Sequence, residues 1–277
     1  MWQYDFMQHA FEAGTIVAII AGIVGYFVVL RRSSFSAHAL SHVGFAGAAG
    51  AVLFGVDPII GLLLFTSGGG ITIALLGRRA AARDVQIGTV LAFMLGLGVL
   101  FISLYSGYAT EAYSILFGEI LGISANDVIV TFVASLIILI LTAIVYRPLL
   151  FASIDEDVAE AKGLPTLFLG VVFMLLVAVA TSISVQVVGV LLIFALMVTP
   201  AAIAQRLAKR PVHGIMISII IALFAMWIGL FVSFYEPYPV SFFITSIVFM
   251  LYVLTLIFQR VNTWLSARRM HFYKHED

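Results

Sequence analysis

The chain has no cysteine, and few of its side chains carry a charge. Charged residues make up 10% of its 277 residues, against about 25% in a typical soluble domain. The missing cysteines exclude disulfides, thiolate metal sites, iron–sulfur clusters and cysteine nucleophiles. There is also no G-x-x-x-x-G-K-[ST] segment, so the chain has no phosphate-binding loop of that type.

Apolar residues take the place of the missing charges. They make up 63% of the chain, against roughly 45–50% in soluble domains, and the mean hydropathy is +1.16. The composition therefore predicts an integral membrane protein. A transmembrane barrel is disfavoured because the apolar runs do not alternate with polar residues.

Nine stretches have the length of about 20 mostly apolar residues that a helix needs to cross the hydrocarbon core. We expect an all-α polytopic membrane protein with about nine transmembrane helices. Residues 1–260 would form one transmembrane domain, and residues 261–277 a basic and polar cytoplasmic tail. The nine stretches are 11–30, 35–56, 58–77, 85–106, 126–146, 164–183, 186–205, 212–234 and 239–259.

Basic residues are confined to alternate connections between these stretches. If Arg31 and Arg32 are cytoplasmic, all 14 Lys and Arg residues fall on the inside. This distribution predicts an N-terminus outside and a C-terminus inside. We do not expect the first stretch to be a cleavable signal peptide, because its basic pair follows the apolar run. The outer segments hold acids and no bases. That acidic face would attract cations. Alternatively, the absence of bases on it reflects the membrane topology alone.

Two segments between the stretches have patterns of their own. Residues 114–124 are too apolar for an ordinary loop and predict a short outer or re-entrant helix. The inner connection 147–165 contains a short helical pattern that begins near Asp155 and ends at Gly163, with acids at its start, as the helix dipole favours. This helix would dock a cytoplasmic partner or serve as a solvated linker.

Glycine and proline mark two further positions. Gly68, Gly69 and Gly70 lie in the third stretch. Each weakens a helix by about 1 kcal/mol relative to alanine, but together they let another helix approach closely. We expect close packing there. Pro200 lies inside the seventh stretch, where it removes a backbone hydrogen bond and is expected to kink the helix.

Two histidines of the second stretch are the ionisable residues that lie well inside a predicted span. His38 and His42 are four residues apart, so they project from one helical face about 6 Å apart. One helix can thereby offer two imidazole nitrogens to one metal ion. Interhelical hydrogen bonding is the simpler use of a histidine in a bundle. Haem is disfavoured because its two axial ligands must come from opposite sides of the ring.

Five segments carry short motifs in a fixed order. They resemble those of the membrane permease subunits of zinc- and manganese-type ATP-binding-cassette importers. The resemblance covers about residues 30 to 205. The motifs are A-L-S-H-V-G at 39–44, D-V-Q-I-G at 84–88, L-F-G-E-I-L at 116–121, Asp155, Ala159 and Gly163 as D-x-x-x-A-x-x-x-G, and V-G-V-L-L at 188–192 with T-P-A-A-I-A at 199–204.

The resemblance implies a set of partners in a bacterial-type plasma membrane. The chain would form a homodimer with the metal path near the two-fold axis. Two copies of a separate ATPase would bind the loop of Asp155, Ala159 and Gly163, and an extracytoplasmic metal-binding protein would deliver the ion. Glu111 and Glu119 would be outer waypoints for the ion, or residues of a solvated loop. The chain itself would be no enzyme, with no permanently bound cofactor and no nucleic-acid partner.

The family motif also bears on which metal is carried. His42 matches the family histidine, whereas His38 stands where the zinc and manganese members commonly have Asp. Nitrogen in place of oxygen favours Zn²⁺ over harder cations, so we expect zinc, with manganese, nickel, cobalt and ferrous iron as alternatives. Imidazole must be neutral to ligate, so uptake should fall as the histidines protonate.

Three other functions remain alternatives at this point. A permease for metal chelates such as siderophores or cobalamin would not need two bare imidazoles. A secondary transporter would usually carry acids within its spans, and none lies mid-span here. A membrane sensor or assembly subunit without transport is the third.

Overall fold

The structure is a computed structural model, and it describes residues 3–75, 80–105, 118 and 120–273. All regular structure in this part of the chain is helical, which confirms the all-α prediction. The helices are α1 Asp5–Leu30, α2 Ser34–Leu53, α3 Pro58–Leu75, α4 Ala80–Leu104, α6 Ala125–Ile154, α7 Glu156–Ala161, α8 Thr166–Val188, α9 Val190–Leu207, α10 Pro211–Tyr235 and α11 Val240–Tyr273.

Among the described residues, eight helices are long and apolar enough to cross a membrane. They fall on eight of the nine predicted stretches. The remaining stretch, 35–56, corresponds to α2, whose 20 residues include serines, glycines and both histidines. It packs against α3, α4, α8 and α9, and a helix enclosed in this way does not have to be apolar towards lipid. The count of nine crossings and the orientation remain predictions.

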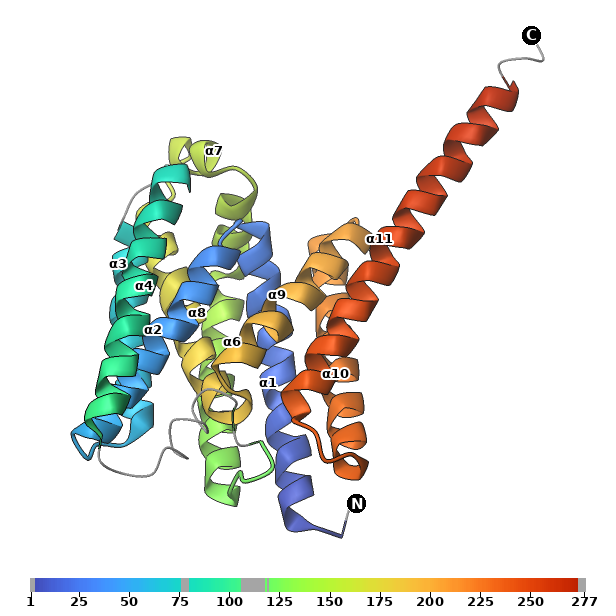
Figure 1. Ribbon diagram of the computed structural model, residues 1–277. Coiled ribbons are helices and arrows are strands. Elements are labelled where there is room, and N and C mark those ends of the chain that lie inside the picture. The colour runs from blue at the N-terminus through green and yellow to red at the C-terminus, as the bar shows by residue number, and fades with distance from the viewer. Residues whose placement is uncertain (1–2, 76–79, 106–117, 119, 274–277) are drawn as a thin grey trace.

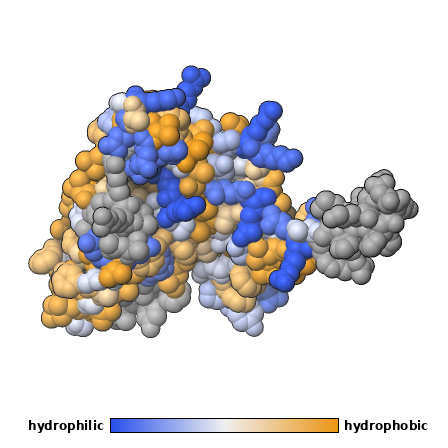
Figure 2. Space-filling model, turned by 90° about the horizontal axis from the view of Figure 1, so that it is seen from above, coloured by the Kyte–Doolittle hydropathy of each residue, from blue (hydrophilic) through white to orange (hydrophobic). Residues whose placement is uncertain are grey.

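The helices form three groups side by side (Figure 1). The first group is α2, α3 and α4, the second is α1, α6, α8 and α9, and the third is α10 and α11. The start of α1 and the end of α11 lie at opposite ends of the molecule, which is the arrangement that an odd number of crossings gives. Figure 2, viewed from the end that carries α7, shows hydrophilic residues gathered at this end and apolar residues on the flanks.

Close helix contacts are made at glycines. A Cβ atom at Gly47 of α2 would collide with the backbone of Gly61 in α3, and the reverse holds as well. The glycine run does not interrupt α3. A Cβ atom added at Gly69 would lie 3.2 Å from Val43, and one added at Gly70 would lie 3.0 Å from the Met174 carbonyl oxygen. Gly68 has open space around it. The expected close packing is confirmed for these two of the three glycines.

A single residue, Gly189, separates α8 from α9. Its φ of +82° and ψ of 163° belong to a backbone region that essentially only glycine adopts. A Cβ atom at Gly118, which also has a positive φ, would collide with Val188. The L-F-G and V-G motifs therefore meet at their glycines. Helix α9 continues through Pro200 without a break, and the kink expected at this proline remains a prediction. The break in regular structure between α8 and α9 comes at Gly189.

Two predicted boundaries differ from the structure. Helix α6 continues through Pro148 to Ile154, so residues 147–154 of the expected coupling loop are its last turns. The apolar sequence after Pro148 explains the extension. Helix α11 runs to Tyr273, so the tail expected from residue 261 begins as a continuation of that helix.

Candidate metal site

The two histidines lie on the open face of α2. Between residues 34 and 50, the side chains of α2 that are not buried are Ser34, Phe35, His38 and His42. The imidazole centroids of His38 and His42 are 4.7 Å apart, with the ring planes at 87°. The prediction that both rings project from one face is confirmed.

Small residues hold the other faces of α2 in place. Gly44 lies against Thr66 and Leu62 of α3, and Gly47 crosses Gly61. Thr66 is itself bonded across to α8, with 2.6 Å between its hydroxyl and that of Ser182. Because α2 is fixed on these sides, the histidine stripe is held towards its one open face.

Each imidazole has a nitrogen without a hydrogen-bond partner. The Nδ1 atoms of His38 and His42 are buried and unpaired in the part of the chain that the structure describes. A buried polar atom left in this state costs about 1–3 kcal/mol. Structural histidines usually avoid this cost through a hydrogen bond. A metal ion bound to the imidazoles would relieve this cost, and metal ligation remains the prediction for this pair.

Phe194 is a neighbour of the site that sequence reasoning missed. This half-buried residue of α9 places its ring centroid 4.6 Å from that of His38, at an interplanar angle of 59°. The imidazole of His38 therefore contacts the rings of both Phe194 and His42. No pattern in the sequence pointed to Phe194, because the pairing of α2 with α9 cannot be read from either helix alone.

One chain supplies too few ligands for a closed site. Within the described residues, no group of three or more His, Cys, Asp or Glu side chains comes together. A closed tetrahedral site needs four protein ligands, whereas His38 and His42 provide two. Glu111 and Glu119, which were predicted as outer waypoints, lie outside the described residues. Of the predicted outer helix, residues 114–117 and 119 also lie outside them, and the part that the structure describes, Gly118 and residues 120–124, is turn and irregular structure instead of helix.

The predicted short helix of the coupling loop is confirmed as α7. The carboxylate of Asp155 accepts a hydrogen bond from the Val158 N–H at 3.0 Å and caps the helix start. Gly163 follows the helix with a φ of +82°. Ala159 is fully buried against Ala152 and Leu169. The three motif residues therefore shape and anchor the loop, and Val158, which is 43% exposed, is available to a partner.

Comparison with known proteins gives consistent matches over most of the chain. The model of the ABC 3 transport family matches residues 3–259. The manganese transport system membrane protein MntC of Listeria innocua is 32% identical over 235 residues, which cover 84% of each chain. The manganese import system permease protein ScaB of Streptococcus gordonii is 30% identical over 232 residues, which cover 83% of each chain.

Two solved structures have similar folds. PsaBC from Streptococcus pneumoniae, in complex with Fab, matches with a TM-score of 0.82 and 30% identity, over 92% of each chain. An inward-facing transporter described as of the metal-chelate type matches with a TM-score of 0.69 and 16% identity. That match covers 89% of this chain and 84% of the other, and at this identity it shows the fold alone.

Proposed function

This chain belongs to the ABC 3 transport family and is the permease subunit of a metal importer; on that premise, we propose that its ions pass His38 and His42. It is a multi-pass protein of the bacterial inner membrane and no enzyme. As a permease of the ATP-binding-cassette type, it would work with a separate ATPase on the cytoplasmic side and an extracytoplasmic metal-binding protein on the other.

The observation that carries the proposed path is the pair of unpaired imidazoles on the open face of α2. His38 and His42 lie 4.7 Å apart between ring centroids, and each keeps a nitrogen without a protein partner. Two imidazoles would hold a metal ion less tightly than four protein ligands do.

A second copy of the chain would complete the site. In a homodimer whose two-fold axis passes the open face of α2, each protomer would present the same two histidines. Four imidazole nitrogens around one point match the tetrahedral coordination that Zn²⁺ prefers. This arrangement would also make up the shortage of ligands found in the described part of a single chain.

Zinc and manganese are both supported as the cargo, by different observations. We propose zinc, because His38 adds a nitrogen donor that favours Zn²⁺ over harder ions. Manganese is the second candidate, because MntC and ScaB are named for manganese transport. A chelate permease has weaker support, since the metal-chelate transporter shares the fold at 16% identity.

Cellular metal accumulation tests the proposal. Cells would express the chain with its ATPase and binding protein, and zinc, manganese, iron, nickel and cobalt would be measured by mass spectrometry. We expect a gain of zinc that His42→Ala abolishes. A gain of manganese that is lost in the same way would keep the path and change the cargo. A gain of metal that His42→Ala leaves intact would overturn the histidine path.

A further inference from the structure

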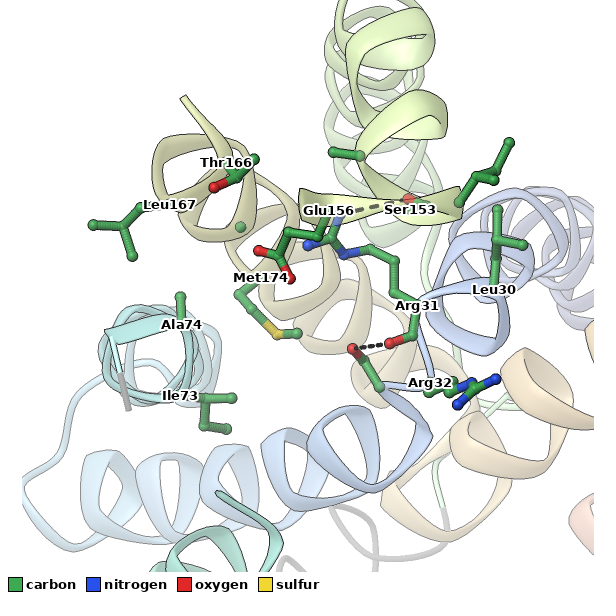
Figure 3. A pocket seen from close by; sticks show the side chains of 14 residues that line it. Leu30, Arg31, Arg32, Ile73, Ala74, Ser153, Glu156, Thr166, Leu167 and Met174 are labelled. Atoms are coloured by element: carbon green, nitrogen blue, oxygen red, sulfur yellow. Dashed lines mark hydrogen bonds between the residues drawn. The ribbon is translucent and has the colours of Figure 1, made fainter. Parts of the chain in front are cut away.

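A cavity of about 640 Å³ lies at the end of the bundle that carries α7. Its walls come from the turn between α1 and α2, the ends of α3 and α6, the start of α7, and α8 (Figure 3). His38 and His42 do not line it, so it is distinct from the proposed metal site. It separates the element that would meet the ATPase from the helix that carries the histidines.

The side chain of Arg31 reaches across this cavity. Its Nη1 atom donates a hydrogen bond to the Ser153 hydroxyl at 3.4 Å. Its guanidinium carbon lies 5.2 Å from the ring centroid of Phe173, within the range of a cation–π contact. Glu156, at the start of α7, lines the same cavity (Figure 3). One side chain thus joins the turn after α1 to the end of α6 and to α8.

Ser153, which accepts the hydrogen bond from Arg31, is connected to α7. Ser153 belongs to the last turn of α6, and Asp155, which caps α7, follows two residues later. Ala159 of α7 is fully buried against Ala152 and Leu169, so α7 is packed onto the ends of α6 and α8. A partner that displaces α7 would therefore displace Ser153 with it.

Arg31 itself is connected to α2 through the backbone and Ser33. The Ser33 hydroxyl donates to the Arg31 carbonyl oxygen at 3.2 Å, and the Ala37 N–H donates to the Ser33 carbonyl oxygen at 3.0 Å. Ser33 is 3% exposed, so this turn is fixed to the helix that it starts. His38 follows Ala37 directly, and movement of Arg31 would be passed on to the metal-binding face within about one helical turn.

We propose that Arg31 is a positioning residue that transmits displacement of α7 to α2, so that ATP hydrolysis by the partner changes the arrangement of His38 and His42. This inference rests on the proposed function. The cavity gives the α7 end of the bundle room to move towards or away from α2. The guanidinium suits the role because its planar fork can hold a hydroxyl and a ring face at the same time.

The test measures zinc or manganese uptake and ATP hydrolysis in the same proteoliposomes, with the complete transporter and its binding protein. Arg31→Met is expected to keep ATP hydrolysis and to lower uptake per ATP roughly tenfold, as the loss of one charge-assisted hydrogen bond would. Arg31→Lys should give an intermediate value, because lysine keeps the charge and loses the fork. Arg32→Met is the matched control, since Arg32 is exposed and lies apart from Ser153.

The ratio of metal uptake to ATP hydrolysis separates this role from a purely structural role of Arg31. If Arg31→Met leaves uptake per ATP unchanged, or if Arg32→Met lowers it equally, the proposal is overturned. If Arg31→Met prevents folding, Ser153→Ala carries the test, because it removes the acceptor and keeps the arginine. An unchanged ratio in Ser153→Ala then refutes the link. A wild-type complex that moves no metal would instead refute the proposed function.

Discussion

At the scale of single residues, His38 and His42 have different surroundings. His38 contacts the rings of His42 and Phe194, and it occupies the position at which we expect an oxygen ligand in related permeases. Its neighbour Phe194 restricts the orientations that the imidazole can take. The identity of residue 38 should therefore set which metal is accepted, whereas His42 should be needed for any metal.

Replacement of His38 by aspartate tests this division of roles. We expect His38→Asp to raise manganese uptake relative to zinc several-fold, because a carboxylate oxygen suits the harder ion better than an imidazole nitrogen does. The measurement is competitive uptake of the two metals in cells, with His42→Ala as the inactive reference. An unchanged ratio in an active His38→Asp variant would show that selectivity is set elsewhere.

The pair of histidines could be predicted from the sequence, because four-residue spacing in a helix fixes the relative direction of two side chains. Phe194 could not, since its contact with His38 depends on how α9 packs against α2. Ala159 illustrates the same limit. Its motif marks it as part of the coupling loop, but only the packing against Ala152 and Leu169 shows that it faces inwards.

At the scale of helices, α7 offers a test of partner docking. We expect Val158→Arg to reduce capture of the ATPase strongly, because the substitution adds bulk and charge to an exposed apolar side chain. The chain itself should fold normally. Ala159→Arg should instead lower stability, since a buried charge without a partner is costly. Pull-down of the ATPase and thermal unfolding distinguish the two effects. Full capture by Val158→Arg would show that α7 docks through another surface.

The one-residue connection between α8 and α9 should not tolerate a side chain. We expect Gly189→Ala to lower the free energy of unfolding by about 1–3 kcal/mol, because its backbone angles are strained for any other residue. Gly170→Ala in α8 is the control, as that glycine has open space around it. Thermal unfolding of the purified proteins is the measurement. Equal melting temperatures for the two variants would contradict the argument.

Helix positions were predicted better than helix ends. Long apolar runs identify the spans because lipid requires them, but they carry no signal for where a helix stops. The predicted span 126–146 therefore stops short of the observed end of α6, which lies beyond Pro148 at Ile154. Gly189 was part of a recognised motif, yet its role as the whole connection depends on backbone angles that the sequence does not state.

At the scale of the whole molecule, the charge distribution gives a direct test of orientation. The chain has no cysteine, so a single introduced thiol can be labelled without background. We expect Glu236→Cys to react with a membrane-impermeant maleimide in intact cells, and Lys209→Cys only after permeabilisation. Both positions are exposed in the structure. The reverse pattern would invert the predicted topology.

The packing of α2 against four other helices has a consequence for how the protein is made. A segment with three serines and two histidines gains little from entering lipid alone, because polar side chains oppose insertion by the translocon. Its stable place exists only between α3, α4, α8 and α9, and the last two are synthesised more than a hundred residues later. The nascent chain must therefore hold α2 in a temporary position, and the metal-binding face is completed only late in biogenesis.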